Sequence, residues 1–284
     1  MRPDTPMDAL GPGIHRGISF AGYLAIPGAN HSLLRTFARS AAHAREEMLH
    51  PAASTAAQEF GQALHAAVLE PAEFERQYAE AEKVDRRTKA GKARWSELEA
   101  QNGSRTLLPA AQWESVLAMK AALLGHATAR ELLTGPGANE VCAIWDDATT
   151  GVRCKGRIDR LATLAGWTFV VDLKTAECAD PQEWGRHSAK WGYHEQAAFY
   201  LDGLAALAPA SRRFAHVVIE KDRPFAVAVC ELDDEAISEG RRRYRRHLAR
   251  WAECERSGEW PGYAEGIHPV RLPTWALSME GAEP

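Results

Sequence analysis

The segment from Glu140 to Thr175 constrains the fold most, because here the chain changes from helical spacing to alternation. It reads EVCAIWDDATTGVRCKGRIDRLATLAGWTFVVDLKT, with β-branched and aromatic residues interrupted at DDATTG and AG. Alternation between such turn signals predicts three antiparallel strands in a meander. Two further strands are expected around KDRP within Arg213–Leu232. The middle of the chain therefore predicts a mostly antiparallel sheet.

Segments with helical spacing flank this sheet on both sides. Helices are predicted over Asn30–His50, Ser54–Pro71, Ala110–His126, His194–Leu207 and Asp233 to about Arg256, with a loop and then a helix between Lys83 and Arg105. The expected fold class is α+β, with helices covering the sheet. We expect one domain over 1–284: an irregular arm (1–31), a helical region (32–133), a sheet core (139–232), and a basic helix with a tail (233–284).

Composition narrows the class of protein. The 284 residues are 45% hydrophobic and 25% charged, with a net charge of −4, so any nucleic-acid surface must be a local basic patch. Five cysteines without a C-x-x-C pair argue against a disulfide framework, a zinc site or an iron–sulfur cluster. The N-terminus lacks an apolar signal core, and no apolar run is long enough to cross a bilayer. We therefore expect a cytoplasmic protein that has no membrane partner.

The hairpin in this segment carries aspartates at predictable positions. If Ala165–Gly166 is a two-residue turn, Leu164 pairs with Trp167. The same register then places Asp159 opposite Asp172. A four-residue loop would keep this register, whereas a three-residue loop would break it.

Three charges converge at the end of this hairpin. Directly opposed residues have Cβ atoms roughly 5 Å apart, and Lys174 follows Asp172 on the same face. Opposed carboxylates destabilise a sheet unless positive charge lies between them, and oxygen ligands suit Mg²⁺ or Mn²⁺. The alternative is a solvated face on which Lys174 merely pairs with one aspartate. The apolar run TFVV leads directly into DLK, which favours the metal site.

An aspartate, a turn and D-L-K after an apolar strand resemble the PD-(D/E)xK nuclease core. The surrounding motifs narrow the resemblance to RecE-type exonucleases, the exonuclease VIII-like proteins of phages and prophages. In order along the chain, these are NHSLLRTFARSAAHAREEM, FGQALHAAVLEP, CKGRIDRL, VVDLKTAECADPQEW, WGYHEQAAFYLDGL, GEWPGY and LPTW. The resemblance covers roughly residues 18–275. It implies the PD-(D/E)xK fold, with a mixed central sheet.

The resemblance also assigns roles to individual residues. It implies that His65, Asp159 and Asp172 bind metal through their side chains and that Leu173 binds it through its backbone carbonyl. Lys174 would be the catalytic lysine. Judged alone, a histidine on an apolar helix is more often a hydrogen-bonded core residue, so the role of His65 depends on the family motif.

Three further residues are supporting candidates. Glu140 begins the first strand, where related nucleases often carry an acidic residue near the metal; the alternative is an exposed residue at a strand entrance. Gln196 and Tyr200 form Q-x-x-x-Y and share one helix face. In the resembled family this pair lies near the active site and the DNA, although as a bare pattern it more often serves packing.

Two basic segments are candidate DNA contacts. The first includes Arg86, Arg87, Lys89 and Lys92, and the second includes Arg241, Arg242 and Arg245. Such clusters can bind phosphates with release of counterions. The alternative for the first segment is an exposed charged loop. The alternatives for the second are a solvated face, or pairing with acidic neighbours such as those in ELDDEAISE.

The resemblance implies a Mg²⁺-dependent exodeoxyribonuclease in the bacterial cytoplasm, with Mn²⁺ able to substitute. It would degrade linear double-stranded DNA processively from 5′ to 3′ and leave 3′ single-stranded tails for recombination. A homo-oligomeric ring and a single-strand annealing recombinase are the implied partners. Two alternatives stay open: another nuclease of this fold, either an endonuclease or a single-strand-specific enzyme, and an inactive DNA-binding protein. A metabolite-binding protein is disfavoured because no phosphate-cradling glycine loop is present.

Overall fold

A six-stranded sheet forms the centre of the protein in a computed structural model that describes residues 10–85 and 87–273. Its spatial order is β1 (Gly13–His15), β4 (Gly137–Asp146), β5 (Arg153–Leu164), β6 (Trp167–Ala176), β7 (Arg212–Glu220) and β8 (Val227–Glu231). Only the β6–β7 pair in this sheet is parallel. The predicted α+β fold with a mixed, mostly antiparallel sheet is confirmed.

The β5–β6 hairpin has the predicted register. Ala165 and Gly166 form the turn with φ angles of 49° and 81°, the left-handed pair that suits the twist of a two-residue hairpin. Leu164 pairs with Trp167, and the ladder continues as far as Arg160 opposite Val171. It therefore ends one pair short of the two aspartates, where the strands part.

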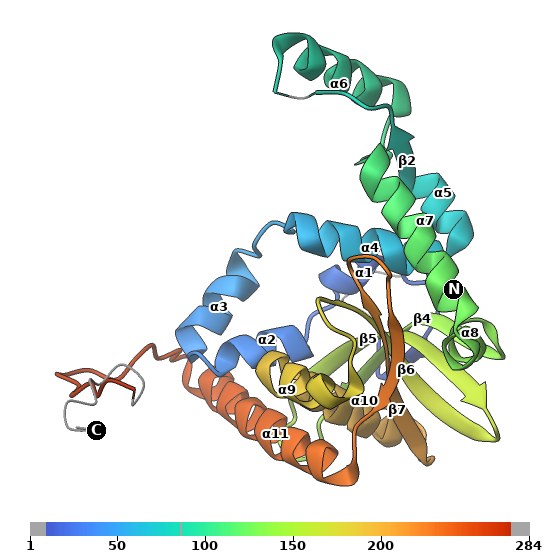
Figure 1. Ribbon diagram of the computed structural model, residues 1–284. Helices are drawn as coiled ribbons and strands as arrows, with labels where there is room; N and C mark the ends of the chain where they lie inside the picture. The colour runs from blue at the N-terminus through green and yellow to red at the C-terminus, as the bar shows by residue number, and fades with distance from the viewer. Residues whose placement is uncertain (1–9, 86, 274–284) are drawn as a thin grey trace, which may run out of the picture.

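Helices cover both faces of the sheet (Figure 1). One face packs against α2 (His31–Phe37), α3 (Ala41–Leu49), α10 (Tyr193–Leu207) and α11 (Asp234–Ser257). The other packs against α4 (Ala56–Leu69), α5 (Pro71–Gln77), α7 (Ala110–Gly125) and α8 (Ala127–Thr134). The sheet is thus the middle layer of three. No helix in the described part of the chain is both long enough and apolar enough to cross a membrane.

The structure differs from the sequence prediction in several elements. The helical segment 30–50 is broken into α2 and α3, because the Ser40 hydroxyl accepts the N–H of His43 and begins a new helix. Helix α9 (Pro181–Trp191) was not predicted, although Asp180 caps it and proline occupies its first turn. The arm expected to be irregular carries β1 and α1 (Phe20–Ala25).

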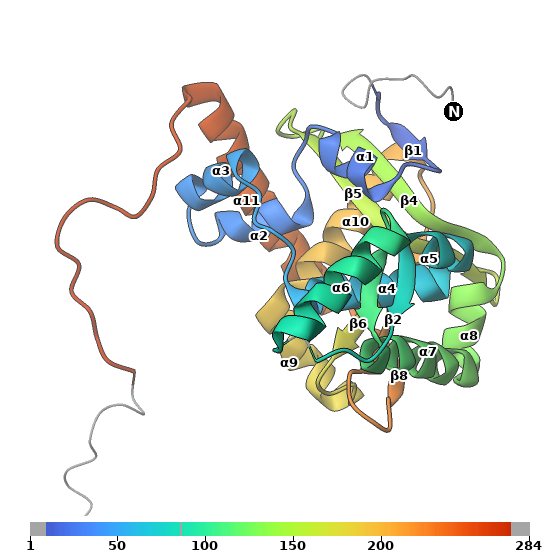
Figure 2. The ribbon, with the colours of Figure 1, turned by 90° about the horizontal axis from the view of Figure 1, so that it is seen from above.

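A small projection interrupts the helical region. It consists of the parallel strands β2 (Tyr78–Ala81) and β3 (Thr106–Pro109), with α6 (Lys89–Asn102) between them. The loop followed by a helix that the sequence predicted here is confirmed. Figure 1 shows α6 standing away from the central sheet, and in Figure 2, seen from above, α6 lies in front of the other elements.

Candidate active site

The two aspartates of the hairpin lie where β5 and β6 separate. Instead of a backbone partner, the N–H of Leu173 donates to Oδ2 of Asp159 at 2.8 Å. The side chain of Asp159 thus bonds to β6 at the point where the backbone pairing of β5 with β6 ends. This bond fixes one carboxylate oxygen against β6.

Asp172 is held by two polar partners. Its Oδ2 forms an ion pair with Nζ of Lys174, and its Oδ1 accepts the side-chain N–H of Gln196 at 2.9 Å. Asp172 is only 3% exposed, so these contacts compensate for the loss of water around its charge. Lys174 Nζ also lies 5.0 Å from the ring centroid of Tyr193, a cation–π contact. Lysine and aspartate are therefore fixed relative to each other.

Helix α4 brings His65 to the hairpin. The helix begins with a capping box made by Thr55 and Gln58, and its apolar residues are buried against the neighbouring helices and the sheet. Nε2 of His65 lies 2.7 Å from the carbonyl oxygen of Leu173, and Nδ1 lies 3.5 Å from Oδ2 of Asp159. The imidazole therefore contacts both strands of the hairpin.

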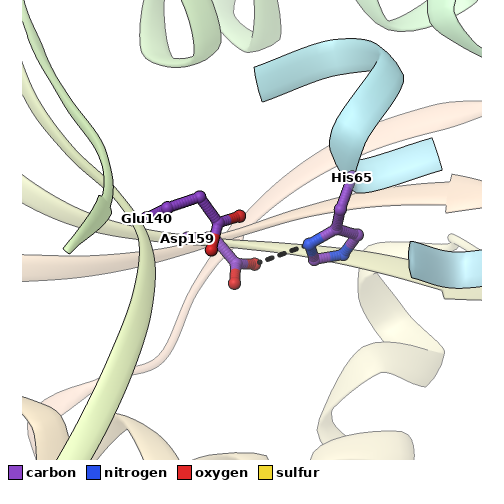
Figure 3. Close-up of side chains that lie close together, drawn as sticks. All are labelled: His65, Glu140 and Asp159. Atoms are coloured by element: carbon purple, nitrogen blue, oxygen red, sulfur yellow. Dashed lines mark ion pairs between the residues drawn. The ribbon is translucent and has the colours of Figure 1, made fainter. Parts of the chain in front are cut away.

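Glu140 reaches the same place from β4. The β4–β5 pairing skips Glu140, whose φ of 51° is rare for a residue with a Cβ atom. Its carboxylate accepts a hydrogen bond from Nε of Arg157 at 2.6 Å. His65, Glu140 and Asp159 each offer one ligand atom, and these atoms lie within 4.8 Å of one another (Figure 3). We call these three residues the carboxylate–histidine cluster.

Burial acts on the pKa of every carboxylate in the site. Burial, and then the charge of Asp159, raises the pKa of Glu140 to about 7. Burial also raises the pKa of Asp159, and the neighbouring Asp172 adds to that shift. Burial disfavours the charge on Asp172 too, but the adjacent Lys174 ammonium outweighs it and lowers the pKa of Asp172. The cluster thus favours an added cation more than the Asp172–Lys174 pair does.

The donor set fits a hard divalent cation. Two carboxylates and one imidazole suit Mg²⁺ or Mn²⁺ better than a soft metal, and no cysteine belongs to the cluster. The expected set included Asp172 and the carbonyl of Leu173. In the structure, the carbonyl oxygen of Leu173 contacts the imidazole of His65. The Asp172 carboxylate contacts Lys174 and Gln196 and does not belong to the three-residue cluster.

The remaining supporting candidate, Tyr200, lies on α10 one turn after Gln196. It is buried and lines the same cleft as the cluster, with its ring against Gly156. The cleft has a volume of about 1190 Å³ and is bordered by α1, α2, the start of α4 and the ends of β4–β6. Arg157 and Tyr193 were not predicted. Arg157 lies in the quoted CKGRIDRL motif, but its pairing with Glu140 could be recognised only from the fold.

The predicted DNA contacts are distributed unevenly around the molecule. Arg241 and Arg245 on α11 both pair with Asp202, and Arg242 pairs with Glu239. Arg87 pairs with Asp85 in the loop that precedes α6, and Lys89 and Lys92 belong to α6 itself. Arg86 lies outside the described residues. The alternative of pairing with acidic neighbours thus describes the three α11 arginines.

The fold and cluster define the class as PD-(D/E)xK-like. Residues 30–273 match the PDDEXK-like domain of unknown function, DUF3799, and the chain belongs to this family. No curated protein matches the sequence significantly.

Solved structures agree with this fold. A crystal structure of a candidate exonuclease from Eubacterium rectale superimposes with a TM-score of 0.59 at 14% identity, covering 85% of this chain and 90% of that chain. At this identity the likeness is one of fold. A second structure, of SSO0001, has a TM-score of 0.28 at 18% identity, covers 68% of this chain and 86% of that chain, and carries no weight. Family, fold and cluster together support a nuclease.

Proposed function

We propose that this protein is a Mg²⁺-dependent deoxyribonuclease that degrades linear double-stranded DNA from 5′ to 3′ and leaves 3′ single-stranded tails. The observation that carries the hydrolytic part is the cluster of His65, Glu140 and Asp159 beside the Asp172–Lys174 pair in one open cleft. The exonucleolytic direction and processivity are supported by the resemblance to RecE-type enzymes.

The chain's own residues divide the work at the scissile phosphate. His65, Glu140 and Asp159 would hold the cation. A divalent cation bound there would lower the pKa of an attacking water and neutralise charge on the phosphate. Lys174 presents an ammonium that orients the water or stabilises the developing negative charge. Gln196 keeps Asp172 in place, and Arg157 does the same for Glu140.

The wider biological setting follows from the resemblance. The proposed substrate is the end of duplex DNA, and the proposed assembly is a homo-oligomeric ring around it. A single-strand annealing recombinase would use the 3′ tail in the cytoplasm of a bacterial host, with the gene carried by a phage or prophage. A backbone-reading site suits attack that ignores base sequence.

Degradation of end-labelled DNA tests this proposal. We expect Mg²⁺-dependent release of label from the 5′ end of a linear duplex, no release in EDTA, and no cutting of covalently closed circles. Internal cuts in circles would retain a nuclease but overturn the exonuclease assignment. DNA binding without any metal-dependent cleavage would overturn the nuclease and support the alternative of an inactive DNA-binding protein.

A further inference from the structure

A tryptophan at the end of α9 stands beside the cleft with two cations around it. Trp191 is 40% exposed. The guanidinium carbon of Arg35 lies 5.1 Å from its ring centroid, and Nζ of Lys190 lies 5.2 Å away. Among the described residues, no carboxylate lies within ion-pair distance of Arg35 or Lys190. A partly exposed indole and two cations without an ion-pair partner among the described residues thus meet at one point.

The position of this group relative to the cluster follows from its neighbours. Arg35 lies one helical turn after His31, which lines the cleft together with Lys174. Gly192, next to Trp191, lies against helix α2: a Cβ atom there would lie 3.6 Å from atoms of both Arg35 and His31. Tyr193, two residues after Trp191, contacts Lys174. The group therefore lies next to residues that line the cleft on the Lys174 side.

Four arginines of α11 are poorer candidates for holding a strand. On α11, the arginines at 241, 242, 243 and 245 are engaged by Asp202 or Glu239. Phosphates would have to displace those carboxylates before they could bind. Arg35 and Lys190 need no such exchange, and neither side chain is buried.

We propose that Trp191, Arg35 and Lys190 form a binding site for an unpaired DNA strand at the rim of the active-site cleft. A base stacks on the indole of Trp191, because every base presents a π face and such stacking ignores sequence. The flanking phosphates contact Arg35 and Lys190. The occupant is an unpaired strand because bases inside a duplex are already stacked on each other. This inference rests on the proposed nuclease function for its choice of DNA as ligand.

Binding of fluorescein-labelled oligothymidine, followed by anisotropy in EDTA, tests the site without cleavage. We expect Trp191→Ala to raise Kd about tenfold and Trp191→Phe to retain most of the affinity. Arg35→Ala and Lys190→Ala are each expected to reduce the slope of log K against log salt by about 0.7. A covalently closed circular duplex, in which every base is paired, should bind Trp191→Ala as it binds the wild type.

The chain offers a matched control at Trp167, in the first position of β6. Trp167 is 46% exposed and lies 5.7 Å from the guanidinium of Arg213, but Glu231 pairs with that arginine. Trp167→Ala should leave the affinity for oligothymidine unchanged. Equal losses for the two alanine variants, or no loss for Trp191→Ala, would overturn the strand site.

The outcomes separate this inference from the proposed function. Cleavage by the wild type with normal oligothymidine binding by Trp191→Ala would reject the strand site alone. Loss of binding in Trp191→Ala, with no metal-dependent cleavage by the wild type, would support the strand site and reject the nuclease. Thermal unfolding of both alanine variants near the wild-type temperature would confirm that the fold is intact.

Discussion

Atom Nδ1 of His65 lies 3.5 Å from Oδ2 of Asp159, and the same carboxylate oxygen accepts the N–H of Leu173. One oxygen therefore joins helix α4 to both strands of the hairpin. Glu140 brings β4 to the same point. The site thus depends on four elements that are separate in the sequence and meet around a single carboxylate.

Removal of that charge should weaken metal binding. We expect Asp159→Asn to lower the affinity for Mn²⁺ at least tenfold, because even residues that merely orient metal ligands contribute that much. Mn²⁺ binding can be followed by electron paramagnetic resonance without DNA. Asp222→Asn, in an exposed loop, is the control and should bind Mn²⁺ as the wild type does. Equal affinities for the Asp159 variant and the wild type would show that the cluster is not the metal site.

The contact between α10 and α11 depends on a glycine. A Cβ atom at Gly240 would lie 2.1 Å from the carbonyl oxygen of His194, which is backbone and cannot rotate away. We expect Gly240→Ala to lower the free energy of unfolding by about 3 kcal/mol. Gly185→Ala in α9 is the matched control, since a Cβ there meets no atom within 4 Å and alanine favours a helix by up to about 1 kcal/mol. Urea titration measures the free energy of unfolding of both variants. A Gly240→Ala variant as stable as the wild type would contradict this packing.

A buried histidine on α11 should make stability depend on pH. Burial, followed by the charges of neighbouring arginines, lowers the pKa of His247 to about 4. Between about pH 6.5 and pH 4 the unfolded chain binds a proton that the folded chain does not, so this contribution to stability falls as pH falls.

The variant His247→Gln isolates this effect from the raised pKa of Glu140, which acts with the opposite sign between about pH 4.5 and pH 7. Between pH 7.5 and pH 5 we expect the wild type to lose about 2 kcal/mol more stability than the variant. Urea titrations at the two pH values measure this difference. Identical changes in both proteins would show that His247 titrates normally in the folded state.

The hairpin could be predicted because its information is local. Ala165–Gly166 fixes the turn, and the turn fixes the register that leads to Asp159 and Asp172. The role of Glu140 was harder to predict, because its distorted backbone and its approach to His65 depend on β4 packing beside β5. The break at Ser40 was missed because apolar spacing continues across it. The pairing of Arg241 and Arg245 with Asp202 joins two helices, so sequence composition alone could not show it.

The central claim is that the cluster and Lys174 form a phosphodiesterase site, and Lys174→Ala tests it most directly. Mg²⁺-dependent degradation of a linear duplex should fall about 10²- to 10³-fold, as expected when one electrostatic donor is lost from a catalytic site. Mn²⁺ affinity should persist in the variant. Lys221→Ala, in the exposed loop between β7 and β8, should retain full activity. Wild-type rates of degradation in the Lys174 variant would contradict the account.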